Sequence, residues 1–412
     1  MTAVFDPGNA GAADYARRRQ AAQRSAYPAW LWPEVSIAAW SNAVGRLAET
    51  ASAILAGRRA TLEGETLATG LAAYTSGLGP LLGWWIERGE LDAGPQLSSL
   101  LETHLSHSRD RSARGTESGK LVVAKFAAAG LSVAILKGGQ TSHAYFPEPA
   151  TRPSSDLDLL VPAADARRAE SALRAAGFVE RSRGARESCW GQATGPVLPA
   201  SVWMVDRDDP WTVDLHWSLD FRPDPGARLV HLDKAKPLDG VEFWTVDRRA
   251  KALPQPLLLL HLAVHAGGGL HSLTLLRMVE LILVIRKDSA EGRLSWAAFL
   301  ALGEATGGLG AAYPALALAD QLAPGTVPAE ILERLGSAAP KRVRTFVGRL
   351  SPATAHRVER TSLREHFMWP SGPSGWMRLL ASDLTPRAGG FGRSLAIYRR
   401  RVTRLIGGGI SR

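Results

Sequence analysis

Apolar residues near the start of the chain recur at intervals of three and four positions. Val44, Leu47, Ala51 and Leu55 have this spacing, which places them on one face of a helix. The first 30 residues carry little periodic apolar content, so we expect a frayed terminus or a short surface helix there. Further helices are expected at 62–75, at 78–88 and from 97 onward.

The pattern changes at about residue 116, where short apolar runs of strand length begin to mix with helical segments. A helix is predicted from 116 to Gly130, and the run 131–137 after it has the length of a strand. Residues 156–161 begin with strict polar and apolar alternation, which is typical of a half-buried strand. Further strands are expected at 178–182, 201–207, 211–217 and 241–247, and helices after Gly139 and at 163–176.

The helical period returns at residue 253 and continues in weaker form to about 349. The stretch 371–387 is rich in Gly, Pro and Ser and is expected to be irregular, and a short basic amphipathic helix is expected at 394–409. We therefore expect an α+β protein in which helical regions flank a small mixed-sheet α/β domain. The expected regions are N-terminal helices at 1–115, the α/β domain at 116–250, and C-terminal helices with a basic tail at 251–412.

Composition narrows the class of protein. Of the 412 residues 45% are hydrophobic, which is enough for a sizeable core and argues against overall disorder. Cys189 is the single cysteine, so an intramolecular disulfide and a four-cysteine zinc site are excluded. No apolar run is long enough for a transmembrane helix, and the N-terminus lacks the apolar core of a secretory signal. A soluble, cytoplasmic protein is expected.

The net charge of +10 is concentrated at the C-terminus. Residues 341–412 hold 15 Lys and Arg against three acidic residues, whereas the preceding residues hold 34 basic and 36 acidic groups. A basic tail can attract phosphate backbones, anionic lipid or an acidic partner. It can equally reflect a GC-rich genome, since Arg outnumbers Lys by 41 to 8.

Three carboxylates have a spacing that indicates chemistry. Asp156 and Asp158 alternate with leucines, so both side chains should leave the same face of a strand. Two close carboxylates repel each other unless a cation lies between them, and magnesium suits such oxygen ligands beside phosphates. Asp214 lies in a second alternating strand, with His216 on its face, and would complete a three-carboxylate cluster.

Two glycines provide the other half of the candidate site. Gly138 and Gly139 stand at a strand end just before a helix, where backbone amides and the helix dipole can receive an anion. A pair of glycines alone is weak evidence. Followed about 17 residues later by an alternating Asp-x-Asp strand, it indicates a phosphate cradle beside a metal-binding pair.

These motifs resemble the uncharacterised nucleotidyltransferase family of the DNA polymerase beta-like superfamily. The superfamily signature is a Gly-Gly or Gly-Ser turn, then an Asp-x-Asp strand, then a third Asp on a later strand, and the residues named above match each part. One position departs, because Gln140 stands where many superfamily members place a phosphate-binding Ser. Other positions that look like this family are Tyr145, Pro147, Arg152, His261 and His265.

The resemblance implies an enzyme that moves a nucleoside monophosphate from a nucleoside triphosphate, such as ATP, to a hydroxyl of a small molecule, peptide or protein. Mg²⁺, or alternatively Mn²⁺, would be the cofactor, in a two-metal mechanism. The implied catalytic and metal-binding residues are Asp156, Asp158 and Asp214. The implied substrate-binding residues are Lys137, Gly138, Gly139, Arg152 and His216.

Ordinary structural roles remain open for several of these residues. Lys137 could be solvated, Arg152 could pair with Asp156 or Glu148, and His216 could be a structural histidine. His261 and His265 are expected to pack against the α/β domain rather than bind metal, and Cys189 is expected in a loop.

Other functions are also open. The chain could be a non-catalytic nucleotide-binding or scaffolding protein on the same fold, or a binder of nucleic acid or membrane surface through its basic tail. Nucleic acid is the less favoured partner, because the body is near neutral and no RNA-binding motif is present.

Two expectations concern the site as a whole. The segment 254–287 and the N-terminal helices should form the far wall of an acceptor pocket, because ligands tend to bind where domains meet. Asp158→Asn should abolish activity without a large loss of stability, because it relieves repulsion between like charges.

Overall fold

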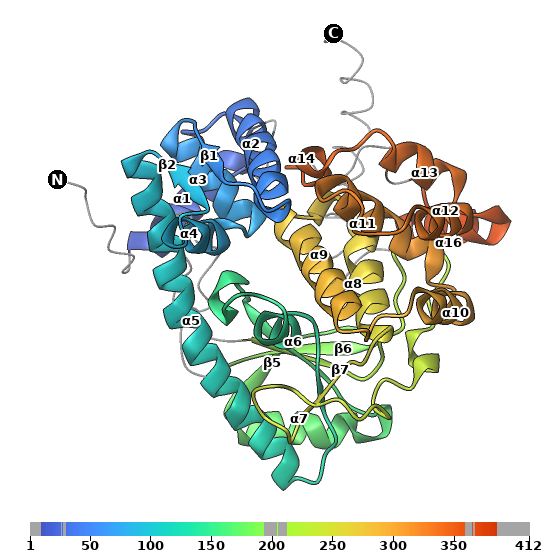
Figure 1. The fold of residues 1–412 in the computed structure, drawn as a ribbon. Helices are drawn as coiled ribbons and strands as arrows, with labels where there is room; N and C mark the ends of the chain where they lie inside the picture. The colour runs from blue at the N-terminus through green and yellow to red at the C-terminus, as the bar shows by residue number, and fades with distance from the viewer. Residues whose placement is uncertain are drawn as a thin grey trace.

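The computed structural model describes residues 10–384, apart from 26, 28–29, 193–203, 205–211, 359–364 and 366. The predicted strand at 201–207 and the predicted helix at 394–409 therefore lie outside the described residues, as does most of the basic tail. The fold is mixed α and β, as expected, with a six-stranded sheet beneath a large helical body (Figure 1).

The N-terminal region is helical, with one small addition. Its helices are α1 (Ala10–Gln23), α2 (Ile37–Leu55), α3 (Thr66–Ser76), α4 (Gly79–Glu87) and α5 (Pro95–Ala128). Two three-residue strands, β1 (Ala60–Leu62) and β2 (Leu91–Ala93), pair in parallel and were not predicted. Helix α5 is 34 residues long and runs straight through the region boundary predicted at residue 115.

The α/β domain follows α5. Its elements are β3 (Ala134–Ile135), α6 (Lys137–Ala144), β4 (Asp156–Leu160), α7 (Ala166–Ala175), β5 (Phe178–Arg183), β6 (Glu187–Gln192), β7 (Thr212–His216) and β8 (Lys251–Ala252). The strand order is β5-β6-β7-β4-β3-β8. The sheet is mixed, because β4 pairs with β7 and β3 with β8 in parallel, while the other pairs are antiparallel.

The alternation of β4 and β7 gives the sheet two unlike faces. Leu157, Leu159 and Leu215 join a buried cluster with α5 and α7, which cover the apolar face. Helix α7 lies below the sheet in Figure 1, and α8 and α9 lie above it. The polar side chains of β4 and β7 therefore point toward the C-terminal helices.

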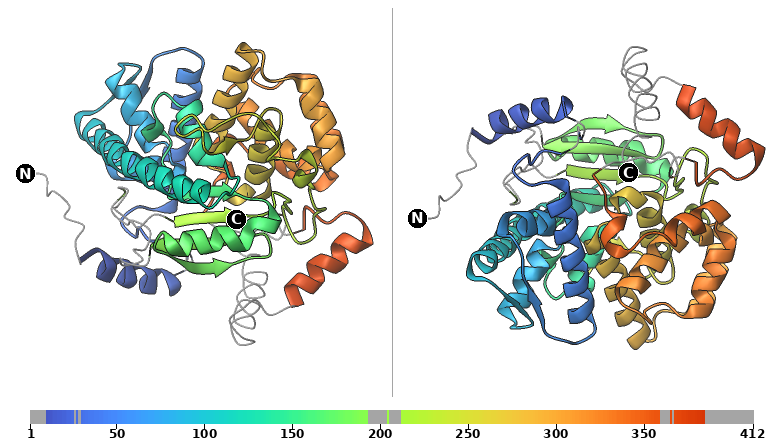
Figure 2. Two further views of the ribbon diagram at one scale, coloured as in Figure 1. Left: turned by 90° about the horizontal axis from the view of Figure 1, so that it is seen from below. Right: turned by 90° about the horizontal axis from the view of Figure 1, so that it is seen from above.

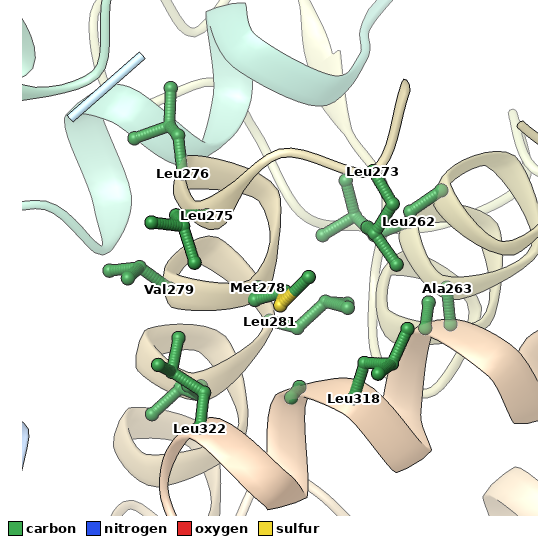
Figure 3. Close-up of a cluster of buried hydrophobic side chains, with 14 of the residues drawn as sticks. Leu262, Ala263, Leu273, Leu275, Leu276, Met278, Val279, Leu281, Leu318 and Leu322 are labelled. Atoms are coloured by element: carbon green, nitrogen blue, oxygen red, sulfur yellow. The ribbon is translucent and has the colours of Figure 1, made fainter. Parts of the chain in front are cut away.

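The C-terminal region is helical. Its helices are α8 (Leu257–Gly268), α9 (Leu275–Ala290), α10 (Trp296–Thr306), α11 (Leu309–Leu322), α12 (Ala329–Ala338), α13 (Lys341–Val347), α14 (Pro352–Ala355) and α16 (Gly372–Leu384). Figure 3 shows apolar side chains of α8, α9 and α11 meeting around Met278. One continuous cluster of buried residues includes both these helices and α2, α3 and α4, so the two helical regions share a single core. The two further views show the blue helices α2–α4 beside the yellow and orange helices α8, α9 and α11 (Figure 2).

Three predictions of secondary structure were wrong. Residues 241–247 form no strand and contribute only an isolated bridge between Phe243 and Lys251 of β8. The stretch 371–387 contains helix α16, which buries Leu379 completely. Cys189 lies in strand β6 rather than in a loop.

Helix α6 is fastened to the C-terminal region by a buried glutamine. Gln140 donates from Nε2 to the carbonyl oxygen of Leu253 at 2.9 Å, and its Oε1 accepts from the Leu253 backbone N–H at 3.1 Å. Both groups of Leu253 are thus satisfied by one side chain. Gln140 therefore has a structural role, because it joins α6 to the segment that precedes α8.

We expect Gln140→Ala to lower the free energy of unfolding by about 2 kcal/mol or more, because it leaves a buried backbone donor and acceptor unpaired. Denaturant unfolding followed by tryptophan fluorescence measures the change. The matched control is Gln96→Ala, an exposed glutamine in the first turn of α5, which should change stability by less than about 0.5 kcal/mol. Equal effects of the two substitutions would contradict the proposed role of Gln140.

Candidate active site

The register between β4 and β7 places the predicted carboxylates on neighbouring strands. Asp158 lies directly opposite Asp214, and Asp156, two residues earlier on β4, shares their face. Burial, Asp158 and Asp214 together raise the pKa of Asp156 to about 6. The structure thus brings the three carboxylates close enough to affect each other's ionisation.

Of the three carboxylates, Asp158 has the closest contacts with positively charged side chains. The Lys137 ammonium donates to its Oδ1 at 2.8 Å, and Nε2 of His216 lies 2.9 Å from the same oxygen. Burial alone would raise the pKa of Asp158, but the Lys137 charge and the His216 hydrogen bond outweigh burial and hold it far below its usual value. Lys137 is therefore not simply solvated, and its backbone adopts a left-handed φ of 41° at the start of α6.

His216 links Asp158 to a residue that the sequence did not single out. Its Nδ1 lies 3.0 Å from Oε2 of Glu187, which stands opposite His216 on β6. Burial would lower the pKa of His216, but hydrogen bonds to Asp158 and Glu187 raise it to about 9. The imidazole is therefore a cation at neutral pH. No polar and apolar alternation marks residues 187–190, so the sequence carried no signal that placed Glu187 on this face.

Asp214 has fewer hydrogen-bond partners than Asp158. In the part of the chain that the structure describes, its Oδ1 is buried without a hydrogen-bond partner. Burial raises its pKa, although a hydrogen bond from the Cys189 thiol on β6 partly opposes this. Burial and the Asp214 carboxylate also raise the pKa of Cys189 to about 12, so the thiol is a proton donor here rather than a nucleophile.

The two glycines lie in the first turn of α6, where no side chain caps the backbone N–H groups. A Cβ on Gly138 would lie 2.2 Å from Nη1 of Arg152, and a Cβ on Gly139 would lie 2.6 Å from Ile135. The backbone therefore approaches both neighbours as only glycine allows. A small cavity of about 40 Å³ opens here, lined by both glycines, Ser154 and Asp156.

Arg152 lines the same cavity but pairs with neither of its expected partners. Its Nε donates to Glu280 of α9 at 2.7 Å, whereas Glu148 pairs with Arg109. Burial would raise the pKa of Glu280, but Arg152 outweighs burial and lowers it. Glu280 lies 128 positions from Arg152, so sequence spacing gave no sign of this contact.

A second cavity, of about 240 Å³, lies on the other side of Lys137. Lys137, Glu187 and His216 line it together with His261 and His265 of α8. Helix α8 therefore faces the carboxylates, as expected for the 254–287 segment. Of the N-terminal region, α5 reaches the smaller cavity through Ser112 and other residues.

The side chains of the site have the chemistry that a divalent cation requires. Asp214 has a buried oxygen without a hydrogen-bond partner among the described residues, and the pKa of Asp156 is raised. Both observations indicate that the three carboxylates carry more negative charge than their neighbours balance. Such a site suits a hard cation such as Mg²⁺. The three carboxylates do not surround a common point as they stand. Within the described residues no group of three or more His, Cys, Asp or Glu side chains is arranged to hold a metal ion. The chemistry of the donors fits, and binding would require the Lys137 ammonium to move from Asp158.

Comparison with known proteins is informative at the level of the family. No described helix is long and apolar enough to cross a membrane. No curated protein and no solved structure matches the chain. The model of the uncharacterised nucleotidyltransferase family matches residues 71–324, which is more than half of the sequence and includes all the site residues named above. The chain therefore belongs to this nucleotidyltransferase family.

Proposed function

We propose that the protein is a metal-dependent nucleotidyltransferase that moves a nucleoside monophosphate from a nucleoside triphosphate to a hydroxyl acceptor. The observation that carries the proposal is the register of Asp158 opposite Asp214, beside the glycine turn that opens α6. Membership of the family supports a transferase that acts on a nucleotide.

The triphosphate is assigned to the small cavity at the start of α6. Uncapped N–H groups of a helix N-terminus favour phosphate oxygens, and the Arg152 guanidinium adjoins Gly138. Mg²⁺, or Mn²⁺ in its place, would be held by the three aspartates and would neutralise charge on the phosphates. Lys137 and His216, both beside Asp158, supply the positive charge that this chain itself contributes.

The acceptor is assigned to the side of Asp214. Its hydroxyl oxygen bonds to the α-phosphorus, the bond from that phosphorus to the bridging oxygen breaks, and pyrophosphate leaves with the electron pair. The hydroxyl proton passes to Asp214, whose Oδ1 has no other hydrogen-bond partner among the described residues and whose raised pKa favours accepting it.

We expect Asp214→Asn to reduce pyrophosphate release by at least about a hundredfold, because it removes both the proton acceptor and a cation ligand. The assay incubates the full chain with each nucleoside triphosphate and MgCl₂ or MnCl₂, with and without hydroxyl acceptors. The control is Asp92→Asn, an exposed aspartate of β2 far from the site in sequence and fold, which should retain full activity. Nucleotide binding without release by the unsubstituted protein would favour the non-catalytic alternative.

The contacts of Asp158 alter the expectation for its substitution. Asp158→Asn leaves the half-buried Lys137 ammonium and the buried His216 imidazolium without their shared acceptor charge, so we expect a loss of about 3 kcal/mol in unfolding free energy. Asp214→Asn relieves a carboxylate that burial disfavours, so its stability should equal or exceed that of the unsubstituted protein. Denaturant midpoints of the two variants test this contrast, and a reversed order would contradict it.

We expect Gly138→Ala to weaken nucleotide binding at least tenfold, because its Cβ displaces an Arg152 guanidinium that Glu280 holds in place. Gly45→Ala is the control, since Gly45 lies within α2 and a Cβ there meets nothing within 4 Å. That change should leave nucleotide affinity unaltered and stability equal or slightly higher. Titration with a fluorescent nucleotide measures both affinities.

A further inference from the structure

The larger cavity beside Lys137 is lined by two guanidinium groups that form no ion pair in the described part of the chain. Arg186 and Arg222 both line it, and each donates to a backbone carbonyl, Arg186 to Asp220 and Arg222 to Ala227 at 2.8 Å. Within the described part of the chain neither guanidinium has a carboxylate within ion-pair distance. The cavity lies against the carboxylate site, because Lys137 and His216 also line it.

The carboxylates near these arginines are committed elsewhere. Asp220 accepts from Nδ1 of His231 at 3.1 Å and from the backbone N–H of Asp233 at 3.1 Å. Glu187 holds Nδ1 of His216. Both carboxylates keep their negative charge, but in the described part of the chain neither forms an ion pair with Arg186 or Arg222.

A third guanidinium adds to this charge. Arg378 of α16 donates to the same Ala227 carbonyl as Arg222, at 3.2 Å, and its Nε is buried without a partner among the described residues. Burial, Arg378 and Arg186 together lower the pKa of Arg222. Arg186 and Arg222 line the cavity and Arg378 lies close to Arg222, so a bound anion would offset the repulsion among these like charges.

The opposite wall of the cavity offers a neutral polar group. His261 lines it from α8, and its Nε2 is buried without a hydrogen-bond partner in the described chain; burial lowers the pKa of this histidine to about 3. A neutral imidazole can donate to or accept from a hydroxyl. The cavity thus combines guanidiniums for an anion with a polar atom suited to a hydroxyl.

We propose that this cavity binds the acceptor, and that the acceptor is a small hydroxylated phosphate monoester whose phosphate contacts Arg186 and Arg222. The proposal rests on the proposed function and specifies its acceptor. A phosphate dianion can accept hydrogen bonds from both unpaired guanidiniums and carries twice the charge of a carboxylate. The volume of about 240 Å³ suits a small molecule rather than a folded protein.

The test measures the binding of three matched compounds to the full chain by calorimetry, without nucleotide or metal. Glycerol 3-phosphate should bind at least tenfold more tightly than glycerate, and glycerol should not bind detectably. Arg222→Gln and Arg186→Gln should each weaken glycerol 3-phosphate binding at least tenfold, and Arg222→Lys should restore part of the affinity. Using two arginine positions keeps the test valid if one variant fails to fold.

The matched control is Arg181→Gln. Arg181 is an exposed arginine of β5 that also donates to a backbone carbonyl, that of Gln192 at 2.8 Å, and does not line the cavity. It should bind glycerol 3-phosphate as the unsubstituted protein does. Equal loss in Arg181→Gln and Arg222→Gln, or binding of glycerol as tight as that of glycerol 3-phosphate, would overturn the proposal. Tighter binding of glycerate would overturn the phosphate assignment.

Asp214→Asn separates this proposal from the proposed function. That variant should lose pyrophosphate release while still binding glycerol 3-phosphate, because the arginines remain. Retained release in Asp214→Asn would refute the catalytic assignment alone. Failure of the unsubstituted protein to bind glycerol 3-phosphate, or unchanged binding in both arginine variants, would refute the acceptor pocket alone.

Discussion

The parallel pairing of β4 with β7 is the constraint on which the site depends. Strand pairing fixes Asp158 opposite Asp214 at the spacing of adjacent strands, so the two carboxylates cannot separate without breaking the sheet. Apolar residues between them, such as Leu157 and Leu215, lock the register by packing on α5 and α7. On the polar face, Lys137 and His216 offset the repulsion between the two carboxylates by hydrogen bonding to Asp158. Asp214 keeps one buried oxygen without a hydrogen-bond partner among the described residues.

The glycine turn at the start of α6 is fixed by hydrogen bonds to residues of the C-terminal region. Gln140 bonds the backbone of Leu253, and Thr141 bonds Glu280 of α9, the same carboxylate that anchors Arg152. One turn further, Tyr145 donates to the buried Asp288 at 3.0 Å. Helix α6 is only eight residues long, too short to be stable alone. Its position at the sheet edge is thus set by residues more than 100 positions away.

The parts of the site that the sequence predicted are those with local periodicity. Alternation at residues 156–160 placed both aspartates on one face, and the same reasoning placed Asp214 with His216. Distant partners had no such signal, since Glu280 sits within an apolar helical stretch and Cys189 is followed by no recognisable strand pattern. The strand predicted at residues 241–247 rested on their β-branched and aromatic residues, which favour strands. In the structure Trp244 is instead buried, and its indole N–H donates to the Gly139 carbonyl.

The shared core of the two helical regions also bears on how the chain acquires its structure. Helices α2 to α4 pack with α8, α9 and α11, yet the whole α/β domain lies between them in sequence. The domain is in effect inserted into a helical body. During synthesis, α2 to α4 would leave the ribosome about two hundred residues before α8, α9 and α11, so part of their apolar surface would stay exposed in that interval. Contacts of such long sequence separation slow folding and favour assistance by chaperones during synthesis.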